Sequence, residues 1–473
     1  MITCAVCVVG GGPAGTTAAR RLAQHGHDVC LVDRGRFQRR HATQSLPPSI
    51  LPLLGQLGLR DRIEDAGFRR PDRSLIRWGA SGAFAKDASP ECGFLVDRDR
   101  FDTVLLDAAR DAGVRVLQPA TVVRVESSDG GSSACLRDGT RVRARFLVDA
   151  AGRSGVLPRG RVLTPLSTMA LYAYWDDSAI DGGEPRIESG ESAWYWGALL
   201  RSGVFCATVF VDGRRCRGLT RPAREAFYHD LIRESTLLAP CVRGRLLGPV
   251  RACDASPFVD ARPVADSTIK VGEAAFAVDP LSSQGVQIAM RSALHAAAVV
   301  HTSVHLPDRA ALARRFYRER IADAAAHHAT LTCRAYAAAG ASEANEFWSA
   351  RSAELRGRSA PALRADTVAD AVVLSPLARV QSSPVLDGEV ICEGAVIAHP
   401  NLDRAVAFLN GVPVAPLVRA ASIPRHRDAL LIEWMQHAPP PVCRQILGWL
   451  WQRGVLEDAR QYVARRLQPS VSS

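Results

Sequence analysis

The chain has 473 residues, of which 47% are hydrophobic and 23% charged, with a formal net charge of +11. This composition is typical of a large globular protein of two or three domains. No run of 18 or more apolar residues occurs, so we expect neither a transmembrane helix nor membrane binding. Arginine supplies the excess charge and is dispersed, which argues against a nucleic-acid partner. The scattered cysteines and the lack of a signal peptide predict a cytoplasmic protein.

The first 33 residues carry the strongest motif. An apolar run, CAVCVV, predicts a buried parallel strand, in which we interpret Cys4 and Cys7 as core residues. The segment GGGPAG contains G-x-G-x-x-G, a helical stretch follows it, and a second strand ends at Asp33. This order is typical of a dinucleotide-binding unit.

Each glycine of this motif has its own expected role. Gly10 permits a tight turn, Gly12 lets the backbone approach a pyrophosphate, and Gly15 lets the helix pack closely on the strand. The helix that begins around Pro13 and Ala14 would offer free N–H groups to the phosphates, and Asp33 would hold ribose hydroxyls. The motif therefore predicts a dinucleotide cofactor.

Three later segments complete this unit. Residues 95–114 predict a helix with an acidic cap and Arg98 at its start, and a hairpin-like run follows over 120–155. Residues 271–297 predict a strand, a loop with Asp279-Pro280, and a helix with Gly285 near its first turn. Such a helix N-terminus would stabilise an anionic reduced flavin through its dipole. The first motif and residues 271–297 are two half-sites far apart in the sequence. They imply that one long cofactor spans a domain built from separate segments of the chain.

These motifs resemble those of the flavoprotein monooxygenase superfamily. In that family FAD is held by G-x-G-x-x-G, by a segment of the type at 149–154, and by a later Gly-Asp segment that has Glu273 here. Residues 37–58, Trp194-Tyr195-Trp196 and 347–351 are similar to the halogenase-like branch. The resemblance implies a split Rossmann-like α/β FAD domain and an antiparallel β-sheet substrate domain.

The motifs and the resemblance together imply a set of residues around FAD and no metal site. The cofactor-binding candidates are Gly10, Gly12, Pro13, Ala14, Gly15, Asp33, Arg40, Gln44, Ser45, Arg98, Glu273, Asp279, Gly285 and Val286. No catalytic residue is assigned, and His41 is the one weak candidate, with a polar contact near the flavin as the alternative. Tyr172, Trp175 and the tryptophans around 194 fall on expected strands of the substrate domain, where core packing is the default.

The stretch GFRRPDRSLIRWG indicates which of two reactions of this family, halogenation or oxygen transfer, the chain performs. The resemblance implies that a halogenase has a buried lysine here, which relays hypohalous acid, and that position is Pro71. The neighbouring Arg70 is a poor substitute, because a guanidinium stays protonated. The remaining lysines, Lys86 and Lys270, lie elsewhere in the sequence. The sequence therefore favours oxygen transfer over halogenation.

Three domains and one helical segment are expected. We assign 1–75, 95–160 and 265–310 to the FAD domain, 76–94 and 161–264 to the substrate domain, 311–370 to a helical segment and 371–473 to a small α+β, winged-helix-like domain. Short strands with turns at Asp387-Gly388 and Asn410-Gly411 are predicted within 384–414, and helices follow, the last over 440–467. From Pro384 onward, 9 arginines face 8 acidic residues, a balance that argues against DNA binding. Peptide recognition by strand addition, or a lid or dimerisation role, stays open.

The resemblance therefore implies an FAD-dependent monooxygenase that uses O₂ and a flavin C4a-hydroperoxide to hydroxylate an aromatic ring. Electrons would come from NAD(P)H or from a reductase. The lost lysine and the added domain make the chain similar to the monooxygenases of quinohemoprotein amine dehydrogenase maturation. The substrate would then be a tryptophan side chain of a peptide or small protein subunit, on the way to tryptophylquinone. The alternatives are a halogenase or hydroxylase of a small or carrier-tethered aromatic metabolite, and a non-catalytic flavin-binding partner.

Overall fold

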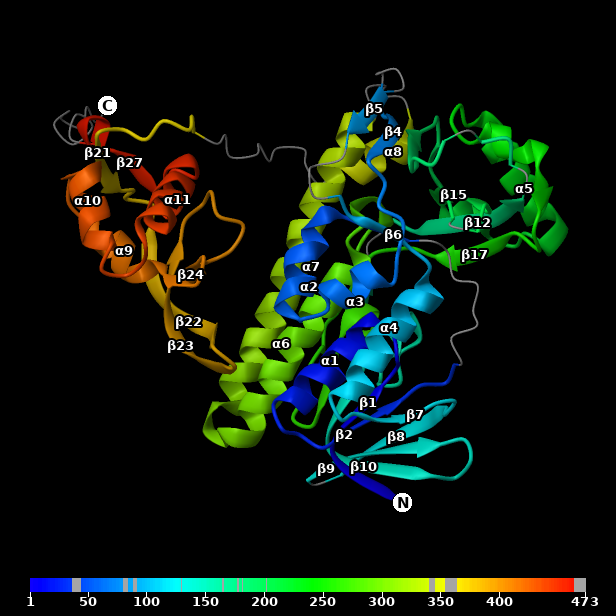
Figure 1. Ribbon diagram of the computed structural model, residues 1–473, viewed down its shortest axis with the longest axis horizontal. Coiled ribbons are helices and arrows are strands. Elements are labelled where there is room, and N and C mark those ends of the chain that lie inside the picture. Colours follow the sequence, from blue (N-terminus) through cyan, green and yellow to red (C-terminus); the bar gives the residue numbers. More distant parts are fainter. Residues whose placement is uncertain are drawn as a thin grey trace, which may run out of the picture. The chain divides into compact units, whose positions relative to one another are not determined.

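The computed structural model describes residues 1–35, 44–79, 84–87, 92–128, 130–163, 166–176, 178–180, 182–200, 202–339, 345–353 and 364–462. The chain divides into two compact units (Figure 1). One comprises residues 1–310 and 317–356, and the other comprises residues 311–316 and 357–473.

The first unit contains a seven-stranded sheet in the order β7-β2-β1-β10-β9-β8, with β19 also paired to β10. Its strands are β1 (Ile2–Val9), β2 (Val29–Val32), β7 (Arg115–Leu117), β8 (Val122–Ser128), β9 (Gly131–Leu136), β10 (Arg141–Asp149) and β19 (Thr268–Lys270). Strands β7, β2, β1, β10 and β19 are parallel to one another, and the antiparallel hairpin of β8 and β9 extends the sheet by antiparallel pairing of β9 with β10. Cys4, Cys7 and Cys30 are buried in this sheet, as expected. The expected Rossmann-like α/β domain is therefore present.

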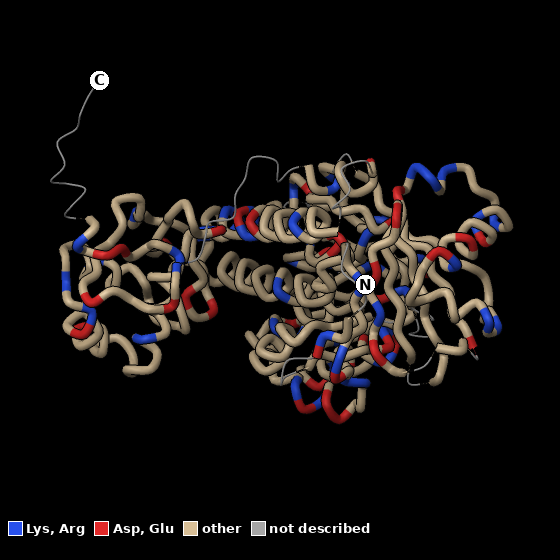
Figure 2. The backbone as a smooth tube through the Cα atoms, turned by 90° about the horizontal axis from the view of Figure 1, so that it is seen from above, with Lys and Arg blue, Asp and Glu red and all other residues tan. Residues whose placement is uncertain are grey.

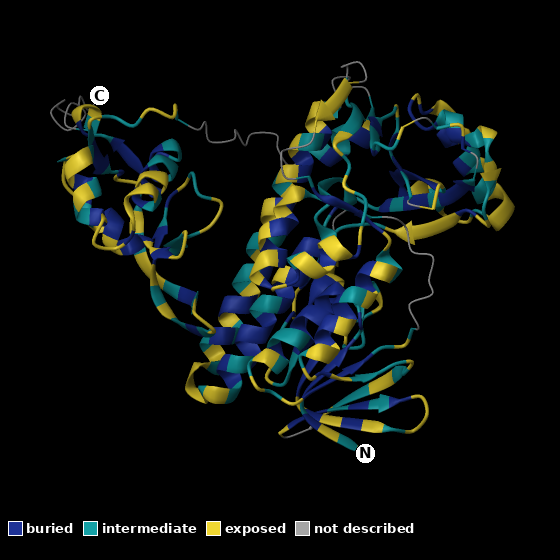
Figure 3. Cartoon of the chain, viewed as in Figure 1, coloured by how far each residue is buried: buried dark blue, intermediate teal, exposed yellow. Residues whose placement is uncertain are grey.

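Three helices accompany this sheet: α1 (Pro13–Gln24), α4 (Arg98–Asp111) and α6 (Gly285–His305). Helix α1 packs against α6 and α4. Figure 3 shows long buried stretches on α1 and α6, whose small residues allow close approach. The acidic cap of α4 is confirmed, because the Asp97 carboxylate accepts from the backbone N–H of Asp99 at 2.9 Å.

The eight-stranded sheet of the first unit has the order β16-β12-β15-β14-β13-β4-β5, with β17 also paired to β12. Its strands are β4 (Arg73–Arg77), β5 (Phe84–Asp87), β12 (Thr168–Asp176), β13 (Arg186–Ser189), β14 (Ala193–Leu199), β15 (Phe205–Asp212), β16 (Arg245–Leu246) and β17 (Arg251–Asp254). All of its pairings are antiparallel except that of β4 with β13. The expected substrate sheet is therefore present, although the domain boundary expected after residue 75 falls within β4.

The two faces of this sheet have different cores. Trp175, Tyr195 and Tyr228 belong to the core that includes helix α5 (Arg221–Glu234). Trp194 and Phe210 face the other way, toward helices α7 (Ala310–Ala339) and α8 (Glu346–Ser352). The alternation of residues along β14 thus sends Tyr195 to one face and its two neighbouring tryptophans to the other.

The remaining elements of the first unit are short. They are β3 (Gln44–Leu46), η1 (Pro48–Ile50), α2 (Leu51–Gln56), α3 (Arg60–Asp65), β6 (Phe94–Val96), η2 (Gly152–Ser154), β11 (Arg161–Leu163), η3 (Gly213–Cys216), η4 (Ala239–Arg243), β18 (Phe258–Asp260), η5 (Gly272–Ala274), β20 (Phe276–Ala277), η6 (Pro280–Ser282) and η7 (Pro307–Arg309). The helical segment expected over 311–370 is helical in α7 and α8, but the described residues 364–370 are irregular.

The second unit is a small α+β unit. Its elements are β21 (Ala371–Leu374), β22 (Arg379–Asp387), β23 (Val390–Ala398), β24 (Phe408–Leu409), β25 (Val412–Pro413), α9 (Val414–Ala420), β26 (Arg425–His426), α10 (Arg427–Trp434), α11 (Pro440–Gln452) and β27 (Leu456–Asp458). The hairpin turns expected at Asp387-Gly388 and Asn410-Gly411 are confirmed, with positive φ at both glycines. The long helix expected from residue 440 is wrong beyond Gln452, because Gly454 has φ +68° and the chain turns into β27.

Charges are interspersed along the backbone (Figure 2). Among the described residues, no helix combines the length and the apolar character that crossing a membrane requires.

Candidate FAD site

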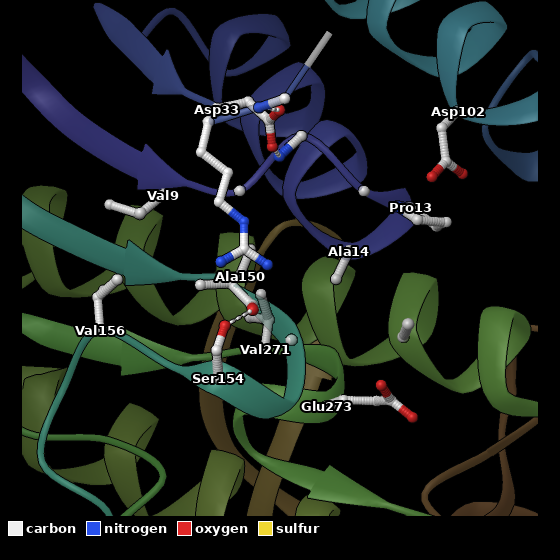
Figure 4. A pocket seen from close by; sticks show the side chains of 18 of the residues that line it. Val9, Pro13, Ala14, Asp33, Asp102, Ala150, Ser154, Val156, Val271 and Glu273 are labelled. Carbon is white, nitrogen blue, oxygen red and sulfur yellow. Dashed lines mark hydrogen bonds between the residues drawn. The ribbon is translucent and has the colours of Figure 1, made fainter. Parts of the chain in front are cut away.

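A pocket of about 500 Å³ lies where β1, β2, β10 and β19 end. Its lining includes Val9 at the end of β1 and Gly10 directly after it, Asp33 after β2, Ala150 after β10 and Val271 after β19. The carboxyl edge of a parallel sheet is where open α/β folds bind nucleotides. In Figure 4 Asp33, Asp102 and Glu273 are spread around the space beside Pro13 and Ala14.

Gly10 and Gly15 have the backbone roles that their spacing predicted, whereas the contact of Gly12 with a pyrophosphate stays a prediction. Gly10 has φ +112°, and a Cβ there would collide with the carbonyl oxygen of Ala150. A Cβ on Gly15 would collide with the carbonyl oxygen of Gly10, so helix and strand pack in contact at this point. Gly12 differs, because it lines the pocket and a Cβ there would meet no atom within 4 Å. That open space is the cradle into which a ligand would have to fit.

Two helices begin at this pocket. Helix α1 has Gly12 as its N-cap and α6 has Gln284, and neither cap residue makes a side-chain hydrogen bond to the first turn. The first residues of both helices, Pro13 and Ala14 in α1 and Gly285 and Val286 in α6, line the pocket. Both helix N-termini thus present positive dipole ends to one cavity, which favours an anionic ligand.

An ion pair holds the wall formed by α4. Arg98 donates to both carboxylate oxygens of Asp102, from Nε at 3.0 Å and from Nη2 at 2.9 Å. A third donor, Nη1, reaches the amide oxygen of Gln44 at 2.9 Å. Burial by itself would lower the pKa of Arg98, but Asp102 holds that pKa above its ordinary value, so the charge is retained. Bidentate contact fixes the Arg98 guanidinium at the pocket edge.

The loop after β10 is organised by a buried carboxylate. Asp149 accepts from the backbone N–H groups of Ala151 at 3.1 Å, Val156 at 2.8 Å and Leu157 at 3.0 Å. These bonds curl residues 150–156 along the pocket, where the Ser154 hydroxyl donates to the Ala151 carbonyl at 2.8 Å. The Asp33 carboxylate has a similar structural task, because it accepts from the N–H of Gly11 at 2.7 Å and of Gly35 at 2.8 Å. Carboxylates thus shape both loops.

Most of the residues predicted from the sequence come together here. The pocket is lined by Gly10, Gly12, Pro13, Ala14, Asp33, Gln44, Arg98, Glu273, Gly285 and Val286. Gly15, Ser45 and Asp279 are not among its lining residues. Arg40 and His41 lie outside the described residues. Arg34 and Asp102 line the pocket and were not predicted, whereas Ser154, which also lines it, belongs to the segment 149–154 that the resemblance implied. The Gly-x-Gly-x-x-Gly context could have indicated Arg34, which directly follows Asp33.

Asp279 has a different environment from the one expected. It is buried, and it accepts from the hydroxyl of Tyr336 on α7 at 2.9 Å and from the N–H of Leu281 at 3.0 Å. Burial raises the pKa of Asp279, although its two donors oppose that shift. Asp279 thus fixes the segment before α6 to α7.

An aromatic cluster lies next to this segment. It comprises Trp194, Phe210, Tyr336, Phe347 and Trp348, with Trp78, Trp196 and Leu281 packed against it. Trp194 stacks on Phe210 with ring centroids 3.7 Å apart, and Trp78 meets Trp348 edge-on at 5.7 Å. None of these side chains lines the pocket described above. Tyr172 shares the face of β12 toward this cluster, whereas Trp175 lies in the opposite core, where its indole N–H donates to Tyr228 at 3.2 Å.

Neither lysine is placed to act as an unpaired buried amine. Lys86 lies on β5, whose residues are all exposed. Lys270 is buried, but its Nζ pairs with Asp260 at 2.7 Å and donates to the carbonyl of Pro158 at 2.8 Å. Pro71 lies just before β4, and the exposed Arg70 contacts the carboxylate of Glu64 at 3.4 Å.

The pocket fits FAD on the evidence of its own atoms. The open cradle at Gly12, two uncapped helix N-termini and the Arg98 guanidinium match a pyrophosphate and an anionic ring system. Asp33 and Glu273 lie at two sides of the pocket, where their carboxylates would meet ribose and ribityl hydroxyls.

Comparisons with known proteins agree. Residues 3–172 match the family described as FAD binding domain. A tryptophan 2-halogenase of Chondromyces crocatus is 31% identical over 339 residues, 66% of this chain and 64% of that protein. A 1H-pyrrole-2-carbonyl peptidyl-carrier protein chlorinase of Pseudomonas fluorescens is 24% identical over 61% of this chain and 73% of its own length.

Solved structures extend the likeness over nearly the whole chain. The peptidyl tryptophan dihydroxylase QhpG, essential for tryptophylquinone cofactor biogenesis, has 27% sequence identity and a TM-score of 0.74, covering 96% of this chain and 99% of that one. The flavin-dependent halogenase CmlS has a TM-score of 0.79 at 20% identity, which shows the fold alone.

Proposed function

We propose that this chain transfers oxygen rather than halogen to an aromatic substrate. The chain belongs to the halogenase-like branch of the FAD-dependent flavoprotein monooxygenases. The substrate that we propose is a tryptophan side chain within a peptide or small protein subunit. The product would be a hydroxylated indole on the way to a quinone cofactor.

One observation carries the choice of oxygen over halogen. The residue where the halogenase pattern has its lysine is Pro71, which offers no amine. Lys270 is committed to a buried ion pair, and Lys86 lies on an exposed strand, so neither replaces it. A charged arginine such as Arg70 does not form the deprotonated amine that this role needs.

The residues of the pocket have binding and positioning roles in this proposal. The first turns of α1 and α6 would hold the anionic parts of FAD. Arg98, which Asp102 fixes at the pocket edge, would contact FAD there. Reduced FAD with O₂ would supply an electrophilic oxygen. Asp279 and Tyr336 would keep the segment before α6 in place, and the packed aromatic cluster beside it would exclude water from that side.

The peptide substrate is supported by the second unit. The likeness to the peptidyl tryptophan dihydroxylase covers 96% of this chain and therefore includes residues beyond the FAD and substrate sheets. Among the described residues, β22 pairs only with β23, so its other edge is a place where a peptide strand would add. The winged-helix comparison, the reductase or NAD(P)H as electron source, and the cytoplasmic location stay predictions.

A second candidate follows from the curated relatives, because a tryptophan 2-halogenase and a carrier-protein chlorinase are among them. The chain would then be a halogenase or hydroxylase of a free or carrier-tethered aromatic compound. A third, a non-catalytic flavin-binding partner, requires only the FAD pocket.

Mass spectrometry distinguishes the three. The full chain is incubated with FAD, a chemical or enzymatic flavin reductant, ¹⁸O₂, excess chloride and bromide, and either a tryptophan-containing peptide or free tryptophan. We expect one or two ¹⁸O atoms on the peptide and no halogen. Halogen on either substrate would overturn oxygen transfer, and labelled free tryptophan without labelled peptide would overturn the peptide substrate. The absence of any product with either substrate would favour the non-catalytic role.

A further inference from the structure

Four histidines gather at the end of the first unit that is remote from the flavin pocket. His25 and His27 follow helix α1, and His301 and His305 lie one turn apart near the end of α6. The Nε2 atom of His27 is 3.1 Å from Nδ1 of His301. One ring nitrogen from each of His27, His301 and His305 lies within 4.8 Å of the other two.

The rings face one shared space from two elements. The centroid of the His27 ring is 5.3 Å from those of both His301 and His305, and the latter two are 4.3 Å apart. The His25 ring meets that of His301 edge-on at 4.6 Å. Spacing i, i+4 places His301 and His305 on the same face of α6. Residues 274 apart in the sequence thus converge without any part in the flavin site.

The backbone holds this arrangement before any ion arrives. Gly26 has φ +82° and ends α1 with a bond from its N–H to the Ala23 carbonyl, and the N–H of His27 bonds to the Leu22 carbonyl at 3.1 Å. Helix α1 packs along α6, which sets the spacing between the two pairs. A preformed set of ligands loses little entropy on binding.

One positive group acts on this histidine cluster. Arg145, an exposed residue of β10, interacts electrostatically with His27, and its charge would oppose a dication.

We propose that His27, His301 and His305 bind one Zn²⁺ ion, with water in the fourth position. Three imidazoles without a thiolate match the nitrogen-rich sites of Zn²⁺ and related transition metals rather than Ca²⁺ or Mg²⁺, which prefer oxygen. The ion would join the turn after α1 to the end of α6.

The site is independent of the oxygenase proposal. His301 lies 16 residues along α6 from Gly285, which lines the FAD pocket, a span of roughly 24 Å. The ion would therefore act as a structural cross-link between two segments of the FAD domain, and metal binding can be measured whether or not the flavin reaction occurs.

The test uses the full chain with FAD, without a histidine tag and after treatment with a chelator. Zn²⁺ is titrated calorimetrically, and Co²⁺ is used to read ligand-field absorption. We expect one equivalent of Zn²⁺, at least tenfold weaker binding in His301→Ala and His305→Ala, and unchanged binding in His437→Ala, an exposed control in the second unit. Arg145→Gln should bind Zn²⁺ more tightly.

His305 is exposed, so His305→Ala removes a ligand without opening a cavity, and FAD occupancy checks that each variant is folded. Zn²⁺ should also raise the melting temperature of the wild type and not that of His305→Ala. Equal Zn²⁺ affinity in the wild type and His305→Ala, or no stoichiometric binding in the wild type, would overturn the proposal.

Discussion

The hydroxyl of Tyr336 lies 2.9 Å from Oδ2 and 3.1 Å from Oδ1 of Asp279, so that α7 is tied to the segment that leads into α6 through one buried pair. Tyr336 belongs to the aromatic cluster, and α6 begins at the FAD pocket. The pair therefore connects the flavin side of the first unit to its substrate sheet.

This pair predicts a pH dependence of stability. Because the folded state raises the pKa of Asp279 above its ordinary value of 3.8, the favourable contribution is fully present below that value and is lost as pH rises through the folded-state pKa. Asp279→Asn keeps the shape and removes the titration. We expect the free energy of unfolding of the wild type to fall, relative to that of Asp279→Asn, as pH increases above about 4. Urea unfolding at a series of pH values measures this, and parallel curves would contradict it.

Substitution by alanine should have different effects at Gly12 and at Gly15. Gly12→Ala places a methyl group in the open cradle, so we expect weaker FAD binding and an unchanged melting temperature of the apoprotein. Gly15→Ala forces a Cβ against the Gly10 carbonyl, so we expect loss of stability even without FAD. Flavin fluorescence titration and thermal unfolding of the apoproteins separate the effects. Full FAD affinity in Gly12→Ala would contradict the placement of the cofactor.

Loss of the carboxylate of Asp102, the partner of Arg98, should cost more free energy than loss of the carboxylate of Asp107, which forms an exposed ion pair on the same helix. Asp102→Asn removes a buried charge that binds Arg98 through two bonds, and we expect a loss of about 1–3 kcal/mol in the free energy of FAD binding or of unfolding. Asp107→Asn, on the same helix, breaks an exposed pair with Arg110 and should cost less than about 0.5 kcal/mol. Equal effects of the two variants would show that Asp102 has no special role.

Substitutions of the two lysines, one buried and one exposed, give another pair of variants to compare. Lys270→Met leaves the buried carboxylate of Asp260 without its paired cation, and we expect a loss of about 3–5 kcal/mol in stability. Lys86→Met changes an exposed residue and should leave both stability and turnover unaltered, within about 0.5 kcal/mol. Denaturant unfolding and the peptide oxygenation assay check this. Loss of product formation in Lys86→Met, with stability unchanged, would reopen a catalytic role for that amine.

Local patterns predicted the parts of the site that depend on backbone geometry. The glycine loop, the acid after β2, the capped start of α4 and the start of α6 at Gly285 follow from spacing and cap chemistry. Asp102 could not be found in this way, because its importance comes from burial against Arg98 in the folded helix.

The same limit explains one open prediction and one error. Asp279 was predicted to bind the cofactor because it precedes α6; it does not line the pocket, and its partner Tyr336 comes from 57 residues away, which local sequence could not indicate. The helix expected after residue 452 failed because the apolar run around Val455 and Leu456 pairs with β21 instead, and a single glycine allows the turn.

The near absence of amines has a practical consequence. Since Lys270 is buried in an ion pair, Lys86 is the exposed lysine of a chain that has only two. A reagent that acylates amines should therefore attach, apart from the α-amino group, at the end of the substrate sheet. A fluorophore placed there would report on substrate docking by energy transfer from a labelled peptide, without an engineered cysteine among the twelve that the chain already has.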